Sequence, residues 1–185
     1  KIFNKNEKTE IIEILEEYSL KKRNVKNKKI NWYSMFKVIC VSGTPGTGKT
    51  TFSIKYSKDN NFYYLDVNEF IKKKELIDDF DKKRDSNIVD TEKLNYQLIE
   101  EIKRLKKEKN YQGIVIDSHL SHYLSKDDVD KVIITKCDLK KLKNRLEKRK
   151  YSKDKIRENM DAEIFDVCKV EALESGHIVE IINTD

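Results

Sequence analysis

Proline, glycine and long apolar runs are scarce in this chain. One proline and five glycines serve 185 residues, so the sequence marks few ends of helices and strands. No apolar run approaches the roughly 18 residues of a membrane-spanning helix. Residues 1–8 also lack the apolar core of a signal peptide. We therefore expect neither a membrane segment nor export, and we expect a cytoplasmic protein.

Cysteine usage argues against two further classes of protein. Cys40, Cys137 and Cys168 lie far apart and form no C-x-x-C pair. The sequence therefore predicts neither a disulfide framework nor a cysteine zinc site.

Charge is abundant instead, because 39 basic and 33 acidic residues give a net charge of +6. Six of the nine residues 21–29 are Lys or Arg, which indicates either a solvated tail or a surface that contacts RNA phosphates.

Strands and helices are predicted to alternate along most of the chain. Short runs rich in β-branched residues predict strands at 36–41, 62–65, 113–117, 131–135 and 178–182. Apolar residues at helical spacing predict a helix at 92–109, and further helices are expected at 49–58, at 139–148 and, as a long polar helix, at 153–173. Such alternation is typical of a parallel sheet covered by helices on both faces. We therefore expect one three-layer α/β domain with a five-stranded parallel sheet.

The two ends of the sequence indicate an unusual order of segments. The chain begins at Lys1, and its first methionine, Met35, directly precedes the first predicted strand. Residues 7–18 carry an apolar stripe at helical spacing, as a helix that covers the last strand would. We therefore expect a domain at 35–185, with 1–34 as its C-terminal helix and basic tail, displaced by circular permutation. The alternative is an N-terminal extension together with a truncated C-terminus.

The strongest motif is Gly43-Thr44-Pro45-Gly46-Thr47-Gly48-Lys49-Thr50. It matches the P-loop pattern G-x-x-x-x-G-K-[ST] and lies between a predicted strand and a predicted helix. The glycines let backbone N–H groups surround phosphate oxygens, Lys49 reaches the β and γ phosphates, and Thr50 binds Mg²⁺. We therefore expect a P-loop NTPase fold that binds ATP at Gly43, Gly46, Thr47, Gly48, Lys49, Thr50 and Thr51.

A carboxylate ends the third predicted strand. Asp117 follows Ile114-Val115-Ile116, the position of a Walker B residue beside the P-loop, and we expect it to hold Mg²⁺ with Thr50. If the chain stays extended, His119 points to the same side and can position a water or a phosphate. A surface histidine is the alternative for His119. His122 and His177 lack such a context, and we interpret both as ordinary residues.

Phosphoryl transfer requires further cations to neutralise the charge of the transition state. Arg145, Arg149 and Arg157 flank a predicted break between two helices, where a mobile lid would close over phosphates. Arg149 lies nearest the break and is therefore our candidate.

Residues 66–89 form a long charged segment, and such segments are often functional. We interpret this segment as an acceptor-binding region, with a solvated helical hairpin as the alternative.

The run Thr135-Lys136-Cys137-Asp138 resembles the guanine-recognition motif [NT]-K-x-D of GTPases. However, Asp117 is followed by Ser118-His119-Leu120, so the glycine of the D-x-x-G switch is missing. In the simpler interpretation, Thr135 ends a strand and Asp138 caps the next helix. A GTPase is therefore the less favoured hypothesis.

Several motifs together resemble one family. They are G-T-P-G-T-G-K-T-T, Asp66-Val67-Asn68, Asp117-x-His119, Arg149-x-Tyr151, Ile156, Glu158-Asn159 and Ala162-Glu163-Ile164. Over residues 35–185 the chain is similar to archaeal adenylate kinases related to adenylate kinase isoenzyme six, which are also described as ribosome-assembly ATPases. Members of this family finish with a helix and a K-I-D-W-like tail. The run Lys29-Ile30-Asn31-Trp32 is similar to that tail and agrees with a permuted order.

This resemblance implies Mg²⁺-dependent transfer of the ATP γ-phosphate to AMP or another nucleoside monophosphate, together with ATPase activity. It implies an ATP loop at Gly46, Gly48, Lys49, Thr50 and Thr51, the Asp117 and His119 pair, and an acceptor region at about 66–89 that includes Asp66 and Asn68. It also implies a lid at about 148–158 that opens near Arg149, although Lys150 replaces a glycine common in the family.

The resemblance further implies a role in late maturation of the small ribosomal subunit. The partners would then be a small-subunit ribosomal protein and rRNA. The alternative function is an assembly ATPase that acts on the ribosomal protein and whose kinase activity is incidental.

Overall fold

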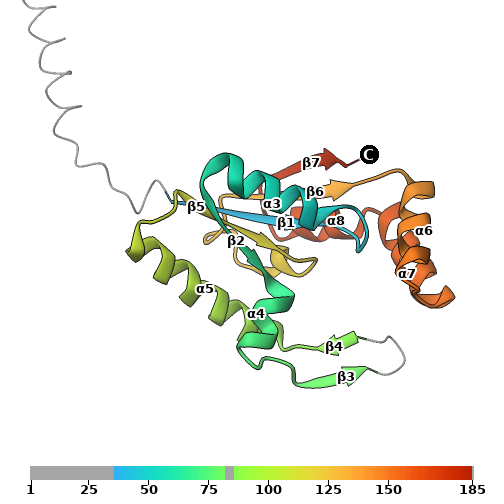
Figure 1. Cartoon of the computed structure of the whole chain (residues 1–185), viewed down its shortest axis with the longest axis horizontal. Helices are drawn as coiled ribbons and strands as arrows, with labels where there is room; N and C mark the ends of the chain where they lie inside the picture. The colour runs from blue at the N-terminus through green and yellow to red at the C-terminus, as the bar shows by residue number, and fades with distance from the viewer. Residues whose placement is uncertain (1–35, 82–85, 185) are drawn as a thin grey trace, which may run out of the picture. The chain divides into compact units, whose positions relative to one another are not determined.

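The computed structural model describes residues 36–81 and 86–184 (Figure 1). The elements in this part of the chain are, in order, β1 (Lys37–Ser42), α3 (Lys49–Asn60), β2 (Phe62–Asp66), α4 (Val67–Lys73), β3 (Asp79–Asp81), β4 (Ser86–Ile88), α5 (Thr91–Glu108), β5 (Gly113–Asp117), a 3₁₀ turn η1 (Ser121–Tyr123), β6 (Lys131–Lys136), α6 (Leu139–Lys148), α7 (Lys153–Ile164), α8 (Val167–Glu174) and β7 (Val179–Asn183). The circular permutation and the helix predicted at 7–18 fall on residues 1–34, outside the described residues.

Five of the strands form one parallel sheet in the order β2-β5-β1-β6-β7. β1 pairs in parallel with β5 on one side and with β6 on the other, so it occupies the centre of the sheet. β3 and β4 form a separate antiparallel hairpin. In open parallel sheets ligands bind at the carboxyl ends of the strands. The predicted α/β fold is therefore confirmed, and the loop that leaves the central strand lies where such a fold binds ligands.

The side chains of β1 alternate between two apolar cores on opposite faces of the sheet. Val38 and Cys40 belong to the core that contains the apolar stripe of α5, and Ile39 and Val41 belong to the core that contains Phe52 of α3. α8 contributes Ala172 to the first core. Figure 1 shows α3 and α5 on opposite sides of the sheet. Helices therefore cover both faces, as the near-continuous apolar runs of the strands predict.

The single helix predicted at 153–173 is wrong. α7 ends at Ile164, and Asp166 has a left-handed φ of 55° before α8 begins at Val167. The Asp166 carboxylate pairs with Lys136 at the end of β6 and, at 3.3 Å, with Lys169 of α8. These ion pairs hold the break close to the sheet. α8 can then turn and pack against β6 and β7.

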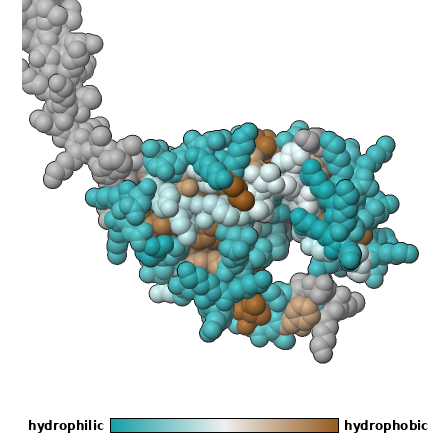
Figure 2. All heavy atoms as spheres, in the orientation of Figure 1, coloured by the Kyte–Doolittle hydropathy of each residue, from teal (hydrophilic) through white to brown (hydrophobic). Residues whose placement is uncertain are grey.

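Residues 66–89 contain one short helix, α4, and the β3–β4 hairpin. The helical hairpin that we considered for this segment is therefore absent from its described residues. Ile77, Phe80 and Ile88 are exposed in and beside the β-hairpin. The face of the molecule drawn in Figure 2 is mainly hydrophilic, with small apolar patches. Within 36–81 and 86–184, none of the helices has the length and apolar character needed to span a bilayer.

Candidate active site

A cavity of about 400 Å³ lies where the chain leaves β1 and β5. Four parts of the fold line it: the P-loop with the first turn of α3, the end of β5, the start of α4, and the predicted lid between α6 and α7. The predicted site residues in its wall are Gly46, Gly48, Lys49, Thr50, Thr51, Asn68, Asp117, His119 and Arg149. The fold therefore gathers residues separated by up to 103 positions, from Gly46 to Arg149, around one space.

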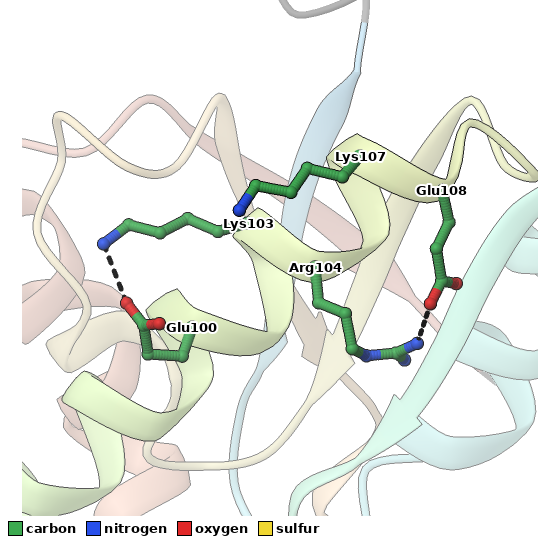
Figure 3. A pocket seen from close by; sticks show the side chains of 5 residues that line it. All are labelled: Glu100, Lys103, Arg104, Lys107 and Glu108. Carbon is green, nitrogen blue, oxygen red and sulfur yellow. Dashed lines mark hydrogen bonds and ion pairs between the residues drawn. The ribbon is translucent and has the colours of Figure 1, made fainter.

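A second hollow, of about 330 Å³, lies over α5 (Figure 3). Four of its five charged side chains are paired with one another, since Lys103 lies 2.8 Å from Glu100 and Arg104 pairs with Glu108. All of its lining side chains come from one helix. Exposed ion pairs of this kind contribute little energy and offer few groups to a ligand. The cavity at the P-loop is therefore the candidate active site.

The shape of the P-loop depends on glycines that neighbouring elements crowd. Gly43 has a φ of 135°, and a Cβ there would lie 2.5 Å from the carbonyl oxygen of Thr135. Gly46 has a φ of 98°, and its Cβ would lie 2.9 Å from a methyl group of Leu142. β6 and α6 thus press on the loop from outside, and only glycine allows both this contact and these backbone angles.

Gly43 and Thr47, which we predicted to bind ATP, support the loop from outside the cavity wall. The Thr47 hydroxyl donates to the Thr44 carbonyl at 2.8 Å and lies 2.7 Å from the Thr135 hydroxyl. Asp138 caps α6 and accepts hydrogen bonds from the backbone N–H groups of its first turn at 2.9 and 3.1 Å. Thr135 and Asp138 therefore act as the simpler interpretation predicts, as strand end and helix cap.

The Lys49 ammonium is held at the mouth of the loop by backbone carbonyls. Its Nζ donates to Gly43 at 2.7 Å and to Thr44 at 3.0 Å. Burial lowers the pKa of Lys49 to about 8, while the carboxylate of Asp117 acts in the opposite direction. The protein alone therefore stabilises the positive charge of Lys49 poorly. Phosphate oxygens bound beside the ammonium group would stabilise that charge.

Asp117 is buried at the end of β5 and forms the Walker B position. Its carboxylate accepts a hydrogen bond from the Tyr64 hydroxyl at 3.0 Å and another from the hydroxyl of Thr50. Burial raises the pKa of Asp117, and these two hydrogen bonds oppose the change. Tyr64 was not predicted, because its position opposite β5 depends on how β2 pairs with that strand.

The Thr50 hydroxyl and the Asp117 carboxylate are oxygen ligands of the kind that Mg²⁺ prefers. Among the described residues, no cluster of three or more His, Cys, Asp or Glu side chains could hold a metal without help. Mg²⁺ commonly takes one or two protein ligands and completes its coordination with phosphates and water. The pair therefore fits a magnesium ion that arrives with a nucleotide.

The predicted histidines occupy different environments. His119 lies in the cavity wall and is exposed. Partial desolvation lowers the pKa of its ring, and the charges of Lys49 and His122 lower it further. Solvent screens part of this effect. His122, which we interpreted as ordinary, is buried between the hydroxyl of Ser42 and the carboxylate of Glu171, each 2.9 Å from a ring nitrogen. It thereby ties the end of β1 to α8.

The three arginines considered for the predicted lid occupy different positions in the structure. Arg149, the predicted residue, lines the cavity at the end of α6. Arg145 instead donates to the carbonyls of Gly46 and Thr184, both at 3.2 Å, and so braces the P-loop. The Arg157 side chain is 85% exposed and lies outside the cavity wall. Lys155 lines the cavity and had not been predicted.

The start of α4 forms the side of the cavity where we predicted the acceptor to bind. Asn68 lines the cavity, whereas Asp66 caps α4 by accepting from the backbone N–H groups of Asn68 at 2.8 Å and Glu69 at 3.3 Å. Asp66 therefore fixes the start of the helix that presents Asn68, and it is not part of the wall itself.

Comparison with known proteins connects this site to a family. Residues 39–166 match the AAA domain family. Over 147 residues the chain is 40% identical to a protein of Methanosarcina acetivorans named "Putative adenylate kinase", covering 80% of this chain and 77% of that one. It is 35% identical over 151 residues to the Saccharomyces cerevisiae protein named "Adenylate kinase isoenzyme 6 homolog FAP7", covering 80% and 73%. The chain belongs to this adenylate kinase isoenzyme 6 family.

A solved structure supports the fold of this family member. The crystal structure of TT1252 from Thermus thermophilus covers 81% of this chain and 89% of its own, with a TM-score of 0.54 and 14% identity. At that identity the likeness concerns the fold alone. It agrees with the α/β fold described above.

Two features of the lid follow from its local structure. Lys150 has a left-handed φ of 57°, a conformation that glycine adopts at a lower cost than lysine. Ser152 caps α7 by accepting from the Lys155 N–H at 3.2 Å, so Lys155 falls in the first turn. Its Nζ lies 4.7 Å from the centre of the Tyr151 ring. The serine three positions before Lys155 was the sequence signal that could have placed this lysine at the lid.

Proposed function

We propose that the protein is a Mg²⁺-dependent nucleoside monophosphate kinase, which transfers the γ-phosphate of ATP reversibly to AMP or another nucleoside monophosphate. The observation that carries this proposal is the shared cavity, because one wall is a P-loop and another is the acceptor-side helix α4. The lid residue Arg149 lines the same cavity. Relatives named as adenylate kinases support AMP as the first acceptor to test.

In this mechanism the chain positions two nucleotides and neutralises charge. Backbone N–H groups at the start of α3 and the ammonium of Lys49 bind the ATP phosphates. Arg149 faces the phosphate that moves, and Asn68 contacts the acceptor. Transfer is in line, without a covalent enzyme intermediate. Closure of the lid excludes water, which would otherwise compete with the acceptor phosphate.

Thr50 and Asp117 would hold the magnesium ion of Mg·ATP, which supplies charge neutralisation at the β and γ phosphates. Tyr64 keeps the carboxylate oriented by its 3.0 Å hydrogen bond to one oxygen. The Asp117 carboxylate also interacts with the hydroxyl of Thr50, so the two magnesium ligands lie next to each other.

A second candidate is an ATPase that drives an assembly step, with kinase activity incidental. His119 favours it, because this histidine lies in the cavity wall with a lowered pKa and can orient a water for attack on the γ-phosphate. The resemblance to ribosome-assembly ATPases extends this candidate to late maturation of the small ribosomal subunit in the cytoplasm. A small-subunit ribosomal protein and rRNA would be the partners.

Acceptor dependence separates the two candidates. ADP formation from Mg·ATP is measured with and without AMP, alongside release of free phosphate. The kinase proposal expects ADP to rise strongly with AMP while little phosphate appears, and CMP, UMP and GMP then define the acceptor. Phosphate release that ignores AMP and increases with a ribosomal partner would instead support the ATPase. Lys49→Ala serves as the control and should lower both activities by about 100-fold or more.

A further inference from the structure

Glu163 is a buried acid for which the proposed chemistry has no use. It lies in the last turn of α7 and is 5% exposed. Its Oε2 accepts a hydrogen bond from the Thr44 hydroxyl at 2.6 Å, whereas its buried Oε1 has no hydrogen-bond partner among the described residues. A buried carboxylate is costly unless both oxygens are satisfied. Positions that violate this rule are often functional.

Lys49 attracts Glu163 electrostatically, but the two lysines that share a void with Glu163 are paired with another acid. Lys136 and Lys169 line the same small void of about 10 Å³ as Glu163. Both ammonium groups pair with the carboxylate of Asp166. The hydrogen bond that defines the position of Glu163 is therefore the one from Thr44, a P-loop residue 119 positions earlier.

Thr44 also contacts the cation of the P-loop. Its carbonyl oxygen accepts a hydrogen bond from Lys49 Nζ at 3.0 Å, while its hydroxyl donates to Glu163. Two consecutive hydrogen bonds thus lead from Lys49 to the C-terminal end of α7. The other end of α7 carries Lys155 and Asn159 in the cavity wall. One helix therefore joins the underside of the P-loop to the lid.

We propose that the chain of contacts Lys49–Thr44–Glu163 couples nucleotide binding at the P-loop to closure of the lid. Glu163 is a positioning residue in this scheme, which rests on the proposed function. Phosphate oxygens draw the Lys49 ammonium away from the carbonyls of Gly43 and Thr44. The loop then adjusts, and the hydrogen bond from Thr44 carries α7 with it. A ligand shifts the equilibrium between an open and a closed lid only if some contact differs between these two states. In this scheme the hydrogen bond between Lys49 and the Thr44 carbonyl is the contact that differs.

Hydrogen exchange of the lid tests the coupling directly. Saturating Mg·ADP should slow exchange at residues 148–158 of the wild-type protein by about tenfold, because closure protects these amides. In the double variant Thr44→Val/Glu163→Met the same ligand should slow exchange by less than about threefold. Replacing both partners with apolar groups of similar size leaves no orphaned polar atom. The melting temperature should therefore equal or exceed that of the wild type.

Two variants that keep the hydrogen bond serve as controls. Thr44→Ser retains the hydroxyl and Glu163→Gln retains an accepting oxygen, so both should keep most of the ligand-induced protection. The double variant should also release more free phosphate per phosphate transferred to AMP, by about fivefold, because a lid that closes poorly admits water.

The outcomes distinguish coupling from a structural role. Wild-type protection in the double variant would overturn the proposal, and so would a melting temperature well below that of the wild type, which would make the pair a structural contact. If the wild-type protein makes no ADP from ATP and AMP, the proposed function fails. The exchange experiment still decides whether the lid responds to Mg·ADP through Thr44 and Glu163.

Discussion

Lys49 shows at the scale of one residue how the fold prepares a site for phosphate. Burial lowers the pKa of this lysine to about 8, and a bound nucleotide raises it again because phosphate charges favour the ammonium. Binding therefore takes up a proton above that pH. We expect the affinity for ADP to fall between pH 8 and pH 10, approaching about tenfold per pH unit.

Calorimetry at several pH values, in buffers of different ionisation enthalpy, measures both the affinity and the proton uptake. Lys49→Arg is the matched control, because a guanidinium stays charged throughout this range. Its affinity for ADP should be weaker but nearly independent of pH. An affinity of the wild-type protein that stays constant between pH 8 and pH 10 would contradict the assigned role of Lys49.

Substitution of His119 tests whether this residue serves ATP hydrolysis more than phosphate transfer to AMP. Its side chain lies in the cavity wall near Lys49, with a lowered pKa that keeps the ring neutral at neutral pH. A neutral imidazole can orient a water, whereas transfer to a bound acceptor does not need one. We expect His119→Ala to lower ATP hydrolysis by about tenfold and transfer to AMP by less than about threefold. Equal losses in steady-state assays of the two activities would exclude a water-positioning role.

At the scale of elements, the turn between α6 and α7 carries strain at one position. Lys150 has a left-handed φ of 57°, which side chains other than glycine adopt at a cost. Lys150→Gly should therefore stabilise the protein by about 0.5–1 kcal/mol, after the greater entropy of glycine in the unfolded chain is deducted. Lys150→Val should destabilise it by about 1 kcal/mol or more, because a β-branched residue suits this region least. Denaturant unfolding measures both, and a destabilised glycine variant would show that this turn is unstrained.

The first turn of α7 provides a second cation for the lid. Lys155 lines the cavity and lies over the ring of Tyr151, whereas Lys153 begins the same helix on its exposed side. We expect Lys155→Met to lower kcat for transfer by about tenfold or more, because charge neutralisation is lost in the transition state. Lys153→Met, the matched control, should change kcat by less than about twofold. Equal effects of the two substitutions would indicate that only the net charge of the helix matters.

At the scale of the whole molecule, the features that the sequence predicted are those that depend on residues close together in the chain. The P-loop, the carboxylate that ends β5 and the helix-flanking Arg149 follow from residues close together in sequence, and the structure places them in one cavity wall. The alternation of strands and helices predicted the sheet because each element has its own apolar pattern. The contacts of Gly43 and Thr47 with Thr135 of β6 were not predicted, because they depend on how β6 packs behind the loop.

Long-range contacts escaped prediction for a physical reason. The break at Asp166 depends on an ion pair with Lys136, thirty positions away, so the sequence predicted one long polar helix where the structure has two. Tyr64 meets Asp117 only because β2 and β5 pair in a particular register. Glu163 meets Thr44 across 119 positions, and a polar helix gives no sign that one of its carboxylates is buried. These contacts form only when the sheet has folded, so the sequence alone does not reveal them.

The most direct test of the account follows the γ-phosphate itself. ATP labelled at the γ position is mixed with Mg²⁺, AMP and the protein, and the labelled products are separated after a single turnover. Because the cavity is lined by both the P-loop and α4, we predict that most of the label appears in ADP formed from AMP. Label found mainly in free phosphate, at the same rate with and without AMP, would contradict the claim that this cavity is the active site of a nucleoside monophosphate kinase.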